Sequence, residues 1–306
     1  MKVIFFGLGS IGKRHLQNLI SVCRANSTDL EVHAFRTKGT EEKIEGIDKY
    51  IYQYNQITDQ YDVTFITNPT AIHYDTLNLM IKNSNFFFIE KPVFDHPNYE
   101  INFTIDPSKV YVAAPLRYKP IMNYLTNYIE DKRIYSARII CSSFLPSWRK
   151  EDYRKSYSAS KELGGGVELD CIHELDYAIW LFGFPKQKKH LILRKSDLEI
   201  ESNDLALYLL EYEDKVVEIH LDYFGVYPQR KIEIITNDDF IVCDLLSDTL
   251  YSQKYGQIVD MKRDNNAMYV EEIKYFIERV MHCQDNWNDL NNAIDVLQLA
   301  RGGTIT

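Results

Sequence analysis

Residues 3–12 read Val-Ile-Phe-Phe-Gly-Leu-Gly-Ser-Ile-Gly, an apolar run that leads into a GxGxxG pattern at Gly7, Gly9 and Gly12. Apolar residues then recur at helical spacing up to about Cys23. Between a strand and a helix, such glycines permit a tight turn, let the backbone approach a pyrophosphate and allow the helix to pack closely on the strand. The stretch therefore predicts a dinucleotide-binding loop, with a glycine turn that holds no ligand as the alternative.

The first part of the chain alternates between strand-like and helical patterns. A helical pattern covers residues 72–81. Further strands are expected at 31–36, 62–67, 86–89 and 110–114. Single helices between strands imply right-handed crossovers and a parallel sheet. We therefore expect an α/β chain that begins with a Rossmann domain, a doubly wound parallel sheet over residues 1–119.

The pattern changes after Tyr118. A helix is expected at 120–128, and strand-like runs with few helices between them follow at 134–143, 191–194, 205–212, 216–224, 231–236 and 240–245. Several runs alternate polar and apolar residues, which indicates an antiparallel sheet with one face solvated or covered by a partner. Two helices, at 268–281 and 290–300, end the pattern. We expect a C-terminal α+β domain at 120–288 with a large, mostly antiparallel open sheet, and a segment at 289–306 that packs back on the first domain.

Composition excludes several classes of protein. The 306 residues carry 35 Lys and Arg against 44 Asp and Glu, a net charge of −9, which argues against nucleic-acid and membrane-surface partners. No apolar run approaches the roughly 18 residues of a membrane span, and the N-terminal apolar run is too short for a signal peptide. The five cysteines are scattered and form no CxxC, which predicts reduced thiols in a cytoplasmic protein without a metal site.

The end of the second expected strand bears on which dinucleotide binds. An NAD site usually has an acid there for the ribose hydroxyls, whereas a 2′-phosphate is met by arginine. Here the residues are Arg36, Thr37 and Lys38, with no acid before Glu41. This favours NADP over NAD, and a solvated basic turn is the alternative.

Four motifs, the glycine loop among them, follow in order along the chain. They are the glycine loop with His15, Thr67-Asn68-Pro69 with His73, Glu90-Lys91-Pro92, and the run Gly164-Gly165-Gly166-Val167-Glu168-Leu169-Asp170-Cys171-Ile172-His173-Glu174-Leu175-Asp176. In this order and spacing the chain resembles, over essentially its whole length, the glucose–fructose oxidoreductase and inositol dehydrogenase (Gfo/Idh/MocA) family. The resemblance implies a Rossmann domain, a second domain whose open sheet is used in oligomerisation, and NAD(P)-dependent oxidation or reduction of a sugar or polyol carbon.

The resemblance also implies roles for individual residues. Lys91 corresponds to the active-site lysine and His173 to the acid/base. The family's aspartate stands four residues before this histidine, whereas here Leu169 occupies that position and Asp170 stands three before. The implied cofactor-binding residues are Gly7, Gly9, Ser10, Ile11, Gly12, Arg36, Thr37, Lys38, Thr67, Asn68, Pro69, His73, Glu90 and Lys91.

Lysine, aspartate and histidine are residue types that suit hydride transfer to or from an alcohol carbon. Hydride transfer at an alcohol carbon requires a group that takes up or delivers the hydroxyl proton, and a histidine with a pKa near 6.5 can do this at neutral pH. A desolvated lysine polarises the same oxygen. Asp170 and His173, at i and i+3, are expected to share one helix face so that the carboxylate orients the ring. The alternatives are a surface lysine and a structural histidine. Tyr177 stands where an HExxH zinc motif needs its second histidine, so no zinc is expected.

A local excess of positive charge bears on the substrate. The stretch 148–161 carries five basic residues against two acidic ones, a net charge of +3, directly before the glycine turn that precedes His173. Arg117, Trp148, Arg149 and Arg154, together with Asp170 and His173, are therefore predicted to bind a substrate with phosphate or carboxylate groups. The alternatives are a solvated loop and contacts to the cofactor's own phosphates.

Together these features favour an NADP-preferring oxidoreductase that acts on a sugar, a sugar derivative or a nucleotide sugar, as in surface-carbohydrate biosynthesis. One alternative is an NAD-dependent inositol or polyol dehydrogenase, and another is a non-catalytic NAD(P)-binding regulator. The long strands with few covering helices predict a homodimer or homotetramer built through the second sheet.

Overall fold

The computed structural model describes residues 1–37, 43–99, 105–261 and 264–301. The chain forms two compact units. Unit 1 comprises Met1–Pro115 and Tyr269–Ile294, and unit 2 comprises Leu116–Met268 and Asp295–Thr306. Among the described residues, no helix has the length and apolar character that crossing a membrane requires.

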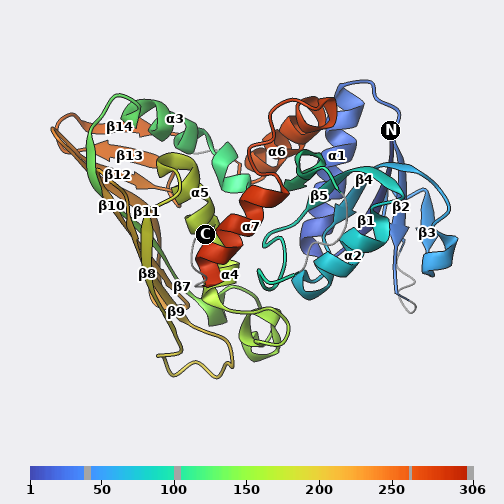
Figure 1. The fold of residues 1–306 in the computed structure, drawn as a ribbon, viewed down its shortest axis with the longest axis horizontal. Coiled ribbons are helices and arrows are strands. Elements are labelled where there is room, and N and C mark those ends of the chain that lie inside the picture. Colours follow the sequence, from blue (N-terminus) through green and yellow to red (C-terminus); the bar gives the residue numbers. More distant parts are fainter. Residues whose placement is uncertain (38–42, 100–104, 262–263, 302–306) are drawn as a thin grey trace. The chain divides into compact units, whose positions relative to one another are not determined.

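Unit 1 contains a six-stranded parallel sheet with the strand order β3-β2-β1-β4-β5-β6 (Figure 1). The strands are β1 (Lys2–Phe6), β2 (Glu31–Phe35), β3 (Lys49–Ile51), β4 (Tyr61–Ile66), β5 (Ser84–Ile89) and β6 (Val110–Val112). Phe6 pairs with Phe35 and Ile66, and Ile66 pairs with Ile89. Because these residues end their strands in register, the loops that follow β1, β2, β4 and β5 emerge at one edge of the sheet.

The helices of unit 1 cover a core that is rich in aromatic residues. They are α1 (Ser10–Ala25), α2 (His73–Met80) and α6 (Ala267–Glu278, in this unit from Tyr269). Phe5 stacks on Phe65 with ring centroids 4.4 Å apart, and Phe88 meets Phe276 of α6 edge-on at 5.4 Å. Burial of these rings explains the continuous apolar runs of the strands, as a parallel sheet with both faces covered requires.

Unit 2 contains an eight-stranded sheet with the order β14-β13-β12-β11-β7-β10-β9-β8. The strands are β7 (Ile134–Phe144), β8 (Gln187–Leu193), β9 (Leu205–Glu211), β10 (Val216–Asp222), β11 (Phe224–Thr236), β12 (Phe240–Asp244), β13 (Thr249–Ser252) and β14 (Gly256–Asp260). All neighbours pair antiparallel except β7 and β10. The fold class expected from the sequence, a Rossmann domain followed by an α+β domain with a large and mostly antiparallel sheet, is confirmed.

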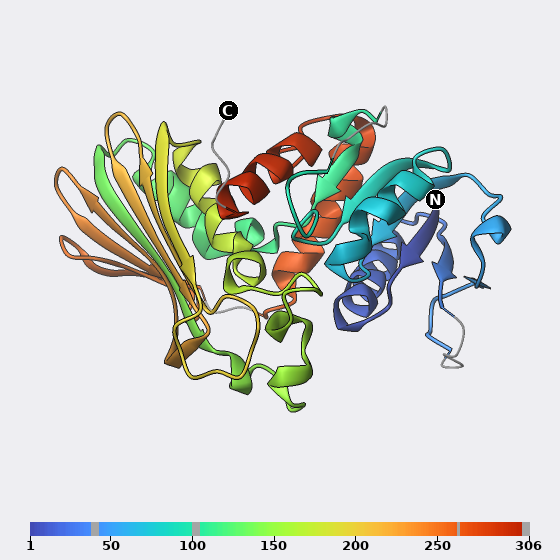
Figure 2. The same cartoon turned by 60° about the horizontal axis from the view of Figure 1, so that its bottom comes forward.

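The helices of unit 2 lie on one face of this sheet (Figures 1 and 2). They are α3 (Pro120–Ile129), α4 (Val167–Asp170) and α5 (Ile172–Phe182), joined at the C-terminal end by the second part of α7 (Leu290–Arg301). α5 packs on β7, and α3 packs on β13. In β9, Ala206, Tyr208 and Leu210 are buried on this side, whereas Leu209 points to the opposite face and is exposed.

Most expected elements agree with the structure to within a few residues. The sequence pattern did not reveal β3 or the hairpin of β13 and β14, in which Gly256, the first residue of β14, has a φ of +80°. These strands are three to five residues long, too short for a clear alternating pattern.

Candidate cofactor and substrate sites

The glycine loop between β1 and α1 is packed closely against the loop after β4. Gly7 has a φ of +95°, and a Cβ there would lie 2.4 Å from the backbone nitrogen of Asn68. A Cβ on Gly12 would lie 2.2 Å from the carbonyl oxygen of Gly7. The hydroxyl of Thr67 donates to the carbonyl of Gly7. Neither glycine can carry a side chain without moving the backbone, which is the physical reason for these two glycines of the motif.

Gly9 differs from its two neighbours in the motif. A Cβ on Gly9 would meet no heavy atom within 4 Å. Gly9 is the N-cap of α1, no side chain caps the helix, and the first turn, which begins with Ser10 and Ile11, contains no acidic residue. Exposed backbone N–H groups at a helix N-terminus bind anions, and the space next to Gly9 admits one. The loop therefore fits the diphosphate of a dinucleotide.

Arg36 follows β2 at the same edge of the sheet. Its backbone N–H donates to Ile51 over 2.9 Å, and its guanidinium lies 5.7 Å from the centre of the Tyr50 ring. Thr37 is exposed, and Lys38 lies outside the described residues. The structure thus places a cation where the adenosine ribose of a dinucleotide lies in a Rossmann domain.

His73 at the start of α2 connects two loops of this edge. Its Nε2 lies 2.9 Å from the carbonyl oxygen of Asn68, and its Nδ1 lies 3.1 Å from that of Pro92. The ring therefore lies between the loop of Asn68 and the Lys91 turn, and its single N–H in the neutral form donates to one of them. Complete burial lowers the pKa of His73, even though the neighbouring carbonyls favour the protonated form.

Glu90 and Lys91 directly follow β5, and the Lys91–Pro92 peptide bond is cis. Oε1 of Glu90 lies 2.5 Å from Nε2 of His15, which comes from α1. Oε2 accepts the backbone N–H of Lys91 over 3.1 Å. Burial opposes the charge of Glu90, but the His15 hydrogen bond and the charges of His15 and Lys91 outweigh it and keep the pKa of Glu90 below its usual value.

In unit 2, Asp170 and His173 lie on two successive helices, which corrects the expectation that they share one helix face. Asp170 ends α4 and His173 lies in the first turn of α5. Cys171 between them has φ −97° and ψ 29°, outside the helical region. The two helices contact different strands, because α4 lies against β9 and β10 whereas α5 lies against β7. One continuous helix cannot follow both parts of the twisted sheet.

Asp170 is bound by tyrosine residues. The hydroxyl of Tyr223 donates to Oδ2 of Asp170 over 2.5 Å. Burial raises the pKa of Tyr223 and of Tyr157, and the nearby Asp170 carboxylate raises both further. Trp148 meets the Tyr223 ring edge-on with centroids 5.3 Å apart. The predicted residues Trp148 and Asp170 therefore belong to one cluster, and the sequence analysis missed Tyr223 because it lies 53 positions away from Asp170.

The basic loop, residues 148–161, borders a cavity of about 260 Å3 whose charged lining residues are Arg149 and Lys155 on one side of the balance and Glu151 and Asp152 on the other, with Trp148 beside them. The guanidinium of Arg149 lies 5.3 Å from the centre of the Tyr157 ring. Arg154 instead forms two hydrogen bonds with Asp152, of 2.8 and 2.9 Å, and a third with Glu199. Of the predicted arginines, Arg149 therefore contacts Tyr157, which lies next to Asp170, whereas the charge of Arg154 is compensated locally.

Arg117 lies in a short 3-10 turn (Pro115–Tyr118) and is 3% exposed. Its guanidinium makes two hydrogen bonds, of 2.8 and 2.6 Å, to the carboxylate of Asp176 on α5. The ring of Trp180 lies 6.0 Å away. Through this pair, Arg117 holds α5, the helix that carries His173, and its guanidinium is occupied by Asp176.

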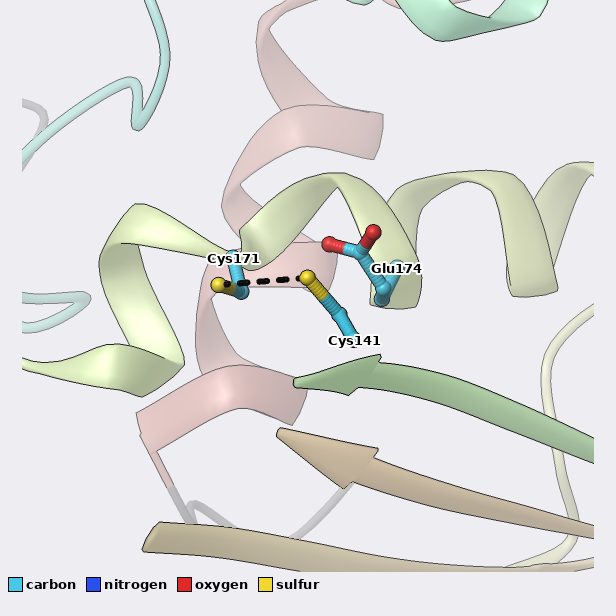
Figure 3. A group of neighbouring side chains, drawn as sticks. All are labelled: Cys141, Cys171 and Glu174. Atoms are coloured by element: carbon cyan, nitrogen blue, oxygen red, sulfur yellow. Dashed lines mark hydrogen bonds between the residues drawn. The ribbon is translucent and has the colours of Figure 1, made fainter. Parts of the chain in front are cut away.

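Figure 3 shows a second buried cluster below the same helices, formed by Cys141, Cys171 and Glu174. The two sulfur atoms face each other at 3.7 Å, and the three ligand atoms lie within 4.8 Å of one another, a spacing that a metal ion could bridge. However, the Arg230 guanidinium lies 2.8 Å from Glu174 and 3.4 Å from the sulfur of Cys141. This positive charge opposes a metal cation, and the hydrogen bond to Cys141 together with burial raises the pKa of Cys171. The cluster therefore joins β7, α5 and β11 as a packing element.

Residues 139–235 match the model of the Gfo/Idh/MocA oxidoreductase family, C-terminal alpha/beta domain. The match covers part of unit 2 and agrees with the resemblance that the motifs indicate. A comparison with curated proteins finds no match.

Solved structures of similar fold span nearly the whole chain. The UDP-N-acetylglucosamine 3-dehydrogenase GnnA from Acidithiobacillus ferrooxidans is 17% identical, with a TM-score of 0.74 and coverage of 99% of this chain and 96% of that one. Levoglucosan dehydrogenase in complex with NADH is 16% identical, with a TM-score of 0.83 and coverage of 98% and 95%. Myo-inositol 2-dehydrogenase from Lactobacillus plantarum is 17% identical, with a TM-score of 0.76 and the same coverage. At these identities the likeness shows the fold.

Proposed function

We propose that this protein is an NAD(P)-dependent oxidoreductase that acts on an alcohol or keto carbon of a sugar, a sugar derivative or a nucleotide sugar. The family of residues 139–235 and the fold of both units support the class of reaction. The similar structures include dehydrogenases of a nucleotide sugar, an anhydrosugar and an inositol, which supports a polyhydroxylated substrate.

The glycine loop is the observation that carries the proposal. Gly7 and Gly12 bring the backbone close to the β4 loop, and Gly9 leaves space beside the uncapped N-terminus of α1. When bound there, the nicotinamide dinucleotide supplies or accepts the hydride. The chain itself binds the diphosphate through the N–H groups of α1 and the ribose through Arg36.

Lys91 and His173 carry the proton chemistry in this proposal. His173 takes the hydroxyl proton as the alcohol is oxidised and returns it in the reverse direction. The charge of Lys91 polarises the substrate oxygen, and Asp170, held by Tyr223, supports the charged form of the imidazole. His173→Ala should lower turnover about 10²–10⁴-fold with cofactor affinity nearly intact. A smaller effect is expected for Asp170→Asn, and full activity of His173→Ala would reject the assignment.

The preferred cofactor is NADP in this proposal, because Arg36 stands at the end of β2 where an NAD site has an acid. The similar levoglucosan dehydrogenase structure contains NADH, so NAD is the competing choice. Fluorescence titration with NADPH and with NADH measures which cofactor binds more tightly. Arg36→Asp should weaken NADPH binding by about 1.5–3 kcal/mol, and equal or tighter NADH binding by the unchanged chain would disprove the preference.

Arg149 and Lys155 line the cavity and are the groups that would bind a substrate with negative charge; of the two acids that also line it, Glu151 and Asp152, the second is paired with Arg154. Turnover should therefore be higher with nucleotide sugars or sugar acids than with inositols, and added salt should lower it. The alternative of an inositol or polyol dehydrogenase is favoured if neutral polyols are turned over best and independently of salt.

The outer face of the second sheet supports self-association. A hollow of about 700 Å3 lies on it, and Leu191 and Leu209 there are 49% and 40% exposed. We infer a homodimer or homotetramer formed through this face. Light scattering at micromolar concentration should give a multiple of 36.0 kDa, and a particle of 36.0 kDa would overturn the inference.

The decisive test of cofactor binding compares wild type with Gly9→Ala. Because a Cβ on Gly9 would lie more than 4 Å from every non-neighbouring heavy atom of the described residues, the substitution should leave the unfolding midpoint unchanged. It should nevertheless weaken dinucleotide binding at least about tenfold if the diphosphate occupies this space, since the methyl group overlaps the ligand. Undiminished affinity in Gly9→Ala, or no binding by wild type, would reject the site; binding without turnover of any sugar would favour the non-catalytic regulator.

A further inference from the structure

We propose that His15 is a positioning residue for Lys91: through Glu90 it holds the Lys91 turn against the helix that begins at the glycine loop. The inference deepens the proposed function and rests on it, because it takes Lys91 to act on the substrate oxygen. All residues of the argument belong to unit 1.

The polar contact of His15 is directed at Glu90. His15 lies on α1, shortly after the glycine loop, and is fully buried. Its Nε2–H donates to Oε1 of Glu90 over 2.5 Å, while Nδ1 has no hydrogen-bond partner among the residues that the structure describes. The rings of Phe88 and Tyr269 lie edge-on to the imidazole, at 4.8 and 6.0 Å, and fix its orientation.

The carboxylate of Glu90 connects His15 with the Lys91 turn. Its second carboxylate oxygen accepts the backbone N–H of Lys91 over 3.1 Å. Glu90 follows Ile89, which pairs in register with Ile66 next to Phe6, so the contact lies at the edge of the sheet where the glycine loop emerges. The path His15–Glu90–Lys91 therefore connects α1, whose N-terminus receives the cofactor diphosphate, with the residue that acts on the substrate.

The contact also sets the charge of Glu90. The titratable groups that face this carboxylate are His15 on α1, the adjacent Lys91, His73 on α2 and Tyr269 on α6. Without the His15 donor, burial would remain and would favour the neutral acid. A protonated Glu90 accepts the Lys91 N–H less strongly, so the turn would lose its fixed position.

The first experiment measures Glu90 itself in the protein without cofactor. In protein labelled with carbon-13 at the glutamate carboxyls, the Glu90 signal is assigned with Glu90→Gln and titrated with pH. The pKa of Glu90 should rise in His15→Ala and return most of the way in His15→Gln, whose amide can still donate. His33→Gln is the matched control, since His33 is another buried histidine of unit 1 and bonds to Glu31 and Tyr61 instead.

The second experiment measures turnover. In His15→Ala, kcat should fall about tenfold to a hundredfold, the effect of a small misplacement of a reacting group, while cofactor affinity stays essentially unchanged. The acid limb of the kcat profile should move to higher pH together with the Glu90 titration, and His15→Gln should recover most of the rate.

The outcomes separate this inference from the proposed function. An unchanged Glu90 titration in both His15 variants, or a shifted titration with unchanged kcat, overturns the positioning role. If wild type turns over no sugar with either cofactor, the proposed function fails. The carboxyl titration then still decides whether His15 controls Glu90, and His15→Gln provides a folded variant if His15→Ala does not fold.

Discussion

The glycine loop of unit 1 and the α4–α5 segment of unit 2 are held in different ways. The loop is shaped by backbone contacts: Gly7 and Gly12 approach neighbouring main chain so closely that no Cβ fits. The α4–α5 segment is held by buried charged side chains, among them the Arg117–Asp176 pair. At Gly7 and Gly12 the loop therefore tolerates no added atom, whereas the helices depend on each charge keeping its partner.

The largest expected effect comes from breaking a charge pair. Arg117→Met should destabilise the protein by about 3–5 kcal/mol, because it leaves the Asp176 carboxylate buried without its cation. Urea unfolding followed by circular dichroism measures it. The double variant Arg117→Met with Asp176→Leu should recover most of the loss, and a double variant as unstable as the single one would show that the pair does not hold α5 through charge.

Adding one methyl group to the loop should have the next largest effect. Gly12→Ala should lower the free energy of unfolding by about 1–3 kcal/mol, because the new Cβ overlaps the Gly7 carbonyl and the backbone must move. Gly9→Ala is the matched control with no overlap. Equal stability of the two variants in urea unfolding would contradict the view that backbone approach shapes the loop.

The buried His73 ring connects two loops of the cofactor edge and should make stability depend on pH. Its folded pKa lies below the unfolded value of 6.5, so the unfolded chain binds more protons in this range. The free energy of unfolding should therefore fall as pH drops below 6.5, by at most about 1.4 kcal/mol per pH unit for one proton. His73→Gln should reduce this slope, and the exposed His282→Gln should not. An unchanged slope in His73→Gln would assign the pH dependence to other groups.

The smallest effect is expected for the exposed charge pair of the basic loop. Arg154→Ala should leave the unfolding midpoint unchanged, since its bonds to Asp152 and Glu199 are in contact with solvent. It should also change turnover of anionic substrates less than Arg149→Ala does, because Arg149 contacts Tyr157, which lies next to Asp170. A larger loss of turnover in Arg154→Ala would restore Arg154 as the substrate-binding residue.

The sequence by itself determined the features that depend on local spacing. The apolar run before Gly7, the GxGxxG loop and the strand–helix alternation predicted the parallel sheet, because each reflects contacts within a few residues. The motifs around Lys91 and His173 named the candidate residues through a family resemblance.

Which distant side chains meet depends on the tertiary packing. Tyr223 reaches Asp170 across 53 positions, and Glu90 reaches His15 across 75, because Asp170 and His15 lie on helices that meet the loops after the strands. The break at Cys171 likewise depends on α4 and α5 packing on different strands. Such contacts leave no periodic signal in the sequence, since burial against a remote element, and not the local pattern, fixes both the partners and their charge.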